Sequence, residues 1–142
     1  MAGERLSSVI EPFFSTFLRA HGFQKKHEFY DPKHFGNELL VFESNELCIR
    51  FIQERGDVFV DVGPIFEDSW YFLDYVLELA EGKQNPPGNS PAPLDSLSSK
   101  IQANFWKIKE LFTELNYPET KDRLEILSRR KTKEMFGPGQ TG

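Results

Sequence analysis

The feature that most constrains this chain is a set of three β-type segments joined by two very short turns. Asn45-Glu46 and Arg55-Gly56 each have the length of a two-residue hairpin loop. With that loop at Arg55-Gly56, Phe51 lies opposite Val60, and with it at Asn45-Glu46, Leu40 lies opposite Phe51. Both turns assign the same residues to one face, and a one-residue slip would break this agreement. An antiparallel meander is therefore predicted over residues 38–44, 47–54 and 57–63.

That register gives the sheet one wholly apolar face and one mixed face. The apolar face, which must pack against helices, carries Leu40, Phe42, Leu47, Ile49, Phe51, Val58, Val60 and Val62. On the mixed face Leu39, Ile52 and Phe59 form one apolar row, although a solvated face is normally polar. Either the first helix or the last two helices cover this row, or it contacts a partner. The candidate partner surface is Leu39, Val41, Glu43, Ile52, Asp57, Phe59 and Asp61.

Helical periodicity accounts for most of the remaining chain. A first helix carries its apolar stripe from Leu6 to Leu18 and ends at Gly22; it starts either near Gly3 or at a capping box formed by Ser8 and Glu11. A short strand follows over residues 25–30, which makes a meander of three or four strands. Three further helices are expected: 70–80, capped by Asp68 or Ser69 and apolar nearly all round; 97–116, ended by Tyr117-Pro118; and 119–135.

These elements predict an α+β fold: an N-terminal helix, the meander, then three C-terminal helices packed on the sheet. We expect a single domain over residues 1–136, with a flexible proline-rich loop at 83–96 and a disordered tail at 137–142. Most of the 14 phenylalanines fall at positions that a helix–sheet core requires.

Cysteine and apolar runs limit the compartment and the class of protein. One cysteine, Cys48, excludes an internal disulfide framework and fits a reducing compartment. The N-terminus has no apolar signal-peptide core, and no apolar run exceeds four residues. A cytoplasmic protein without a membrane partner is therefore expected.

Charge is unevenly distributed along a chain whose net charge is −5. Residues 43–81 hold ten acidic and two basic residues, a net −8, whereas residues 100–134 are net positive. An acidic surface would steer a basic partner, although many of these carboxylates are ordinary solvent-facing positions. The basic cluster at 129–133 is interpreted as cations at a helix C-terminus, and nucleic-acid binding is not expected of an acidic domain.

Chemistry-bearing residues form no recognisable catalytic set. His21, His27 and His34, with Asp31, lie within one stretch, and imidazole and carboxylate groups could together ligate a metal or hold a small ligand. Their spacing matches no known motif. Cys48 falls mid-strand among apolar and acidic neighbours, which predicts a raised pKa and an inert thiol. No nucleophile, base and orienting group assemble, so no enzyme and no cofactor are expected.

The leading hypothesis is a small non-catalytic binding module, such as an adaptor, an inhibitor or an immunity-type protein, that presents an acidic surface to a basic protein partner. One alternative is a metal-binding or small-ligand protein that uses the histidine region. Another is a homodimer in which two copies of the sheet face meet.

Overall fold

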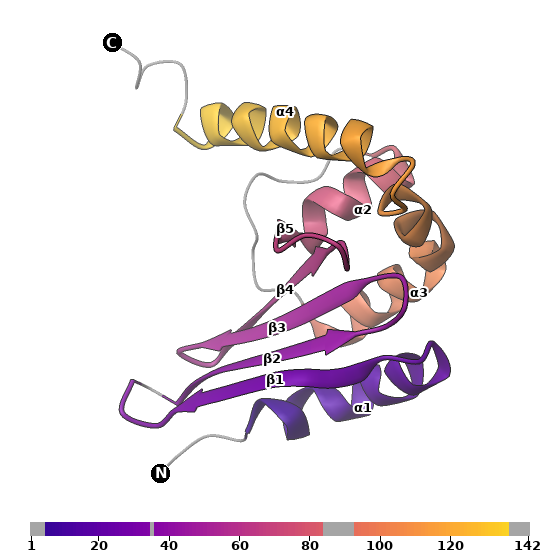
Figure 1. The fold of residues 1–142 in the computed structure, drawn as a ribbon. Coiled ribbons are helices and arrows are strands. Elements are labelled where there is room, and N and C mark those ends of the chain that lie inside the picture. Colours follow the sequence, from indigo (N-terminus) through magenta and orange to yellow (C-terminus); the bar gives the residue numbers. More distant parts are fainter. Residues whose placement is uncertain (1–4, 35, 84–92, 137–142) are drawn as a thin grey trace.

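A computed structural model describes residues 5–34, 36–83 and 93–136 of the chain. It has an α+β fold with an N-terminal helix, an antiparallel five-stranded sheet and three further helices (Figure 1). The elements are α1 (Leu6–Ala20), β1 (Gln24–Asp31), β2 (Asn37–Glu43), β3 (Cys48–Glu54), β4 (Asp57–Gly63), β5 (Tyr71–Phe72), α2 (Leu73–Glu81), α3 (Leu94–Leu111) and α4 (Tyr117–Phe136). None of the helices in the described ranges is both long and apolar enough to cross a membrane.

The sheet is a simple meander in the order β1-β2-β3-β4-β5, and its predicted register is confirmed. Phe51 pairs with Leu40 on one side and with Val60 on the other. At the first turn, Ser44 accepts a hydrogen bond on Oγ from each of the backbone N–H groups of Glu46 and Leu47. The predicted apolar face forms the core: its side chains are buried, except that Phe42 is partly buried.

Helix α1 begins at Leu6, and the predicted capping box is wrong. The N-cap residue is Arg5, and its side chain makes no capping bond. The cap comes instead from β2, because the Glu38 carboxylate accepts the Leu6 backbone N–H at 2.9 Å. Arg5 donates from Nε and from a terminal nitrogen to the same carboxylate, both at 3.0 Å. Gly22, at φ +74°, ends the helix as predicted.

Helix α2 is shorter than predicted, and neither Asp68 nor Ser69 caps it. Tyr71 and Phe72 pair with β4 as a fifth strand, so the helix starts at Leu73. It packs against β4, α3 and α4, which confirms that an all-round apolar helix is covered on more than one side. Gly82 ends it in the left-handed conformation, as expected.

The boundary between the last two helices is also corrected. The third helix ends at Leu111, and Tyr117-Pro118 begins α4 instead of ending α3. Leu115, predicted to lie on an apolar stripe, is 89% exposed in the connection. Residues 94–96 of the predicted proline-rich loop are helical; residues 84–92 of that loop and the predicted tail at 137–142 lie outside the described residues.

Candidate binding face of the sheet

The predicted apolar row exists and is one strand wider than expected. Phe29 on β1 pairs with Leu39, Leu39 with Ile52, and Ile52 with Phe59. The row therefore crosses four strands, a width of about 14 Å at the usual strand spacing. Phe29 is 56% exposed, and Leu39, Val41, Ile52 and Phe59 are half-buried.

Helices cover the opposite face of the sheet. Helix α1 packs on β2 and β3, where Phe14 contacts Phe51 with ring centroids 4.9 Å apart, and α2 packs on β4. In Figure 1, α1 and α3 lie behind the strands, and α4 runs along the β5 side of the sheet. Within the described ranges, neither the first helix nor the last two cover the row. We call this surface, with Phe29, Leu39, Val41, Ile52 and Phe59 at its centre, the open face.

One end of the same face is covered by residues 64–70, which join β4 to β5 and which we call the covering segment. At Gly63 an added Cβ would lie 2.1 Å from the Ser69 carbonyl oxygen, so only glycine permits this close approach. The Trp70 ring lies over the Arg50 guanidinium, 4.7 Å from the centroid. The segment therefore lies over Gly63 and Arg50 at this end of the face and does not reach the row at Phe59.

Asp61, a predicted surface residue, is instead only 4% exposed. Its Oδ2 accepts hydrogen bonds from Arg50 Nε at 2.9 Å and a terminal Arg50 nitrogen at 2.8 Å, and Oδ1 has no hydrogen-bond partner among the residues that the structure describes. Burial raises the pKa of Asp61, and the Arg50 bonds only partly oppose this rise. Asp61 therefore forms an internal ion pair with Arg50 and is not part of the accessible surface.

The acidic rim of the open face consists of residues near its two ends. Glu54 and Asp57 are exposed beside the β3–β4 turn, and Glu43 is half-buried at the other end. No salt bridge involves these three carboxylates among the residues that the structure describes. Cys48, next to Glu43, is a buried free thiol whose pKa burial raises to about 12, as its sequence environment predicted.

The three histidines occupy separate environments. His21 packs on the Phe105 ring with centroids 4.3 Å apart, whereas His34 Nδ1 lies 2.5 Å from Asp31 Oδ2 in the β1–β2 turn. His27 lies on β1, opposite Val41. No three His, Cys, Asp or Glu side chains of the described chain lie close enough to hold a metal.

A polar cluster that the sequence did not predict joins the covering segment to α4. Glu67 Oε2 accepts hydrogen bonds from Ser69 Oγ at 2.6 Å, Tyr117 Oη at 2.7 Å and Lys121 Nζ at 3.4 Å. Tyr71 Oη lies 2.7 Å from Tyr117 Oη. Burial and these hydrogen bonds raise the pKa of Tyr117, so the phenol stays protonated and the cluster acts as a structural link.

Comparison of the chain with protein-family models, with curated proteins and with solved structures found no match to any of them. Interpretation of the open face therefore depends on its own chemistry. The contribution of Phe29 could have been found from a fourth strand paired with β2. The position of Trp70 over Arg50 could not, because it depends on a segment that forms no regular helix or strand.

Proposed function

We propose that this protein is a small non-catalytic binding module and that the open face of its sheet is the binding surface. The observation that supports this is the apolar row of Phe29, Leu39, Ile52 and Phe59, which crosses four strands under no helix of the described chain. Accessible apolar patches of this kind mark partner surfaces in soluble proteins. Their centre supplies most of the binding energy when aromatic side chains are buried by the partner.

The rim determines the chemistry of the partner. Glu43 lies at one end of the apolar centre and Glu54 and Asp57 lie at the other, and the whole chain has a net charge of −5. A partner with an apolar centre and basic rim residues would match both features. Since the row is about 14 Å wide, it covers only the middle of a standard interface, and the partner must also contact the rim.

A non-catalytic role agrees with the contacts of the polar side chains in this region, which pair with one another inside the protein. The Arg50–Asp61 pair joins β3 to β4, the Trp70 ring lies over Arg50, and the Glu67–Tyr117 cluster ties the covering segment to α4. The raised pKa of Cys48 makes its thiol a poor nucleophile. We further propose a cytoplasmic location, because a free buried thiol persists most readily in a reducing compartment.

The test is affinity capture from a lysate of the source organism with matched variants of the open face. Leu39→Ser and Phe59→Ser should each weaken retention of a specific partner by about 30-fold, the effect of losing an interface hot spot. Leu115→Ser removes an 89% exposed leucine elsewhere and should leave retention unchanged. Retention of the same partner by all three variants would contradict the proposal.

Charge and self-association are tested separately. Asp57→Lys should weaken capture and its salt dependence, whereas Glu114→Lys, an exposed change on the α3–α4 connection, should not. Sedimentation equilibrium of the purified chain decides whether the partner is a second copy. A dimer that Phe59→Ser converts to a monomer would replace the basic partner with self-association.

A further inference from the structure

A groove lies between α2, α3 and α4 and shares no residue with the open face. Two adjoining hollows of about 320 and about 390 Å³ form it, and both are lined by Leu79 and Arg123. Trp106 on α3 and Ile126 on α4 line its walls and are 61% and 59% exposed. We call it the helical groove. Large, accessible apolar side chains beside a hollow are typical of a docking surface.

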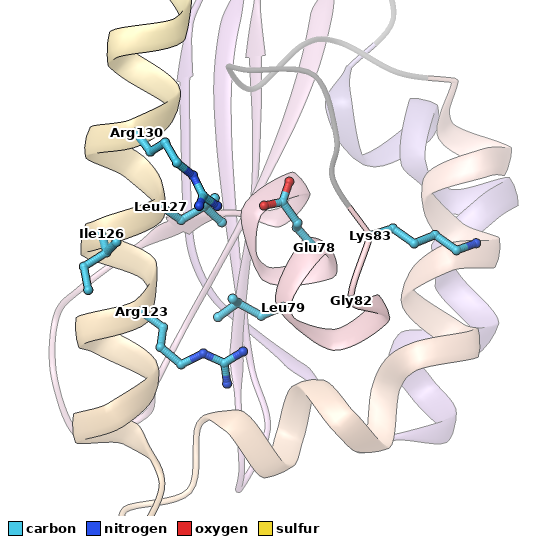
Figure 2. Close-up of a pocket in the computed structure, with 8 residues that line it drawn as sticks. All are labelled: Glu78, Leu79, Gly82, Lys83, Arg123, Ile126, Leu127 and Arg130. Atoms are coloured by element: carbon cyan, nitrogen blue, oxygen red, sulfur yellow. The ribbon is translucent and has the colours of Figure 1, made fainter.

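Two arginines of α4 give the first hollow its charge. Figure 2 shows Arg123 and Arg130 extending from α4 toward α2, whereas Lys83 extends away from α4. Neither arginine forms a salt bridge with any described residue. The Glu78 carboxylate lines the same hollow, but it is 7% exposed and pairs with Lys131 Nζ at 3.0 Å. The two guanidinium groups are therefore available to an anionic ligand.

The positive charge of the groove is concentrated in its first hollow, because the second hollow also carries acidic side chains. Glu110 and Glu119 line only the second hollow, together with Lys107 and the shared Arg123. The first hollow thus has a local cationic character on a chain whose net charge is −5. A ligand that prefers this place to the acidic open face must be acidic itself.

The spacing of the arginines indicates the form of that ligand. Seven residues on one helix correspond to about 10.5 Å and nearly two turns, so Arg123 and Arg130 lie on the same side of α4. A helical ligand with carboxylates seven residues apart has the same spacing on one face. In an extended ligand this distance corresponds to about three residues, whose side chains point to opposite faces.

We propose that the helical groove binds an acidic amphipathic helix of a partner protein. Two carboxylates, seven residues apart, pair with Arg123 and Arg130, and each guanidinium can hold a carboxylate through two parallel hydrogen bonds. Apolar side chains between the carboxylates contact Leu79 and Ile126, which line the same hollow as the two arginines. This site is independent of the open face and takes a ligand of opposite charge.

The proposal is tested by selecting binders from a displayed library of helical peptides with the purified full chain as bait. Enriched peptides should carry Asp or Glu pairs seven residues apart with an apolar residue between them. Their affinity should fall by about tenfold or more for Arg123→Glu/Arg130→Glu and for the milder Arg123→Gln/Arg130→Gln. Arg129→Glu, which changes an arginine that lines a different hollow of α4, should retain the affinity.

Any of the following results would overturn the proposal. One is that no peptide is enriched. Another is that enriched peptides bind the Arg123/Arg130 variants as well as the wild type. A further one is that free inorganic phosphate at millimolar concentration abolishes binding, which indicates a simple anion site. The last is that binding is lost in Phe59→Ser, which assigns the peptides to the open face and leaves the groove without a ligand.

Discussion

The strongest prediction concerns Glu38, because two different residues could cap α1. In the structure, the Glu38 carboxylate is fully buried and accepts the Leu6 backbone N–H and two Arg5 donors, while Ser8, the sequence-based candidate, makes no capping bond. Loss of an N-cap costs about 1 kcal/mol, and loss of a charge-assisted hydrogen bond about 1.5–3 kcal/mol. The Arg5 side chain is 45% exposed, so solvent weakens its share.

We therefore expect Glu38→Ala to lower the free energy of unfolding by about 2–3 kcal/mol, or Tm by about 6–9 °C for a chain of this length. Ser8→Ala should change the free energy of unfolding by less than about 0.5 kcal/mol. Urea unfolding followed by circular dichroism measures both variants. A large loss for Ser8→Ala together with a small loss for Glu38→Ala would refute the assigned cap.

The pH dependence gives an independent check on Glu38. Burial alone would raise its pKa, but the hydrogen bonds from Arg5 and Leu6 outweigh burial and hold the pKa below its ordinary value of 4.5. A carboxylate with a lowered folded-state pKa stabilises the fold above about pH 4.5 and loses this effect as the pH falls through the folded-state value. Glu38→Gln, which keeps an acceptor for Leu6, should remove that part of the acid sensitivity.

Two further predictions test how the covering segment and α4 are held, and a third tests the burial of Cys48. Gly63→Ala should destabilise the fold by about 1–3 kcal/mol or more, because the added methyl group meets the Ser69 carbonyl oxygen; unchanged thermal stability would contradict this contact. Lys131→Met should cost about 3–5 kcal/mol by leaving Glu78 without this buried cation, whereas Lys131→Met/Glu78→Leu should recover most of the loss in urea unfolding. The Cys48 thiol, with its pKa raised to about 12, should react with iodoacetamide at pH 8 much more slowly in the folded chain than in urea; equal rates would show an accessible thiolate.

The sheet was predictable because its register depends on local sequence features, and two of these features independently predict the same register. Two short turns and the alternation around Phe51 specify one register, and each turn tests the other. The row through Leu39, Ile52 and Phe59 follows from that register without further assumption. Its accessibility does not follow, because it depends on where the helices pack.

Two errors come from contacts between distant residues, and a third comes from the point at which a helix ends. The cap of α1 comes from Glu38, 32 residues beyond Leu6, and a local serine pattern cannot reveal it. Leu115 continues the helical periodicity of α3, yet the chain turns before it. The register places Asp61 opposite Arg50, but it cannot show that Asp61 is buried or that the Trp70 ring, from outside the strands, lies over Arg50.

The helical groove shows the same limit. Arg123 and Arg130 were part of a basic C-terminal region in sequence, where cations beside a helix end are ordinary. Their orientation toward α2 depends on how α4 packs through Leu124 and Leu127. Only the folded chain separates these two arginines from Arg129, which pairs with Glu125 on α4.

The most direct test of the open face is photo-crosslinking from position 59 in cells of the source organism. A benzophenone amino acid in place of Phe59 should crosslink to a second polypeptide, and the same group in place of Leu115 should not. Crosslinking from position 59 only to helices of its own chain would mean that the face is covered internally. That result would contradict the account.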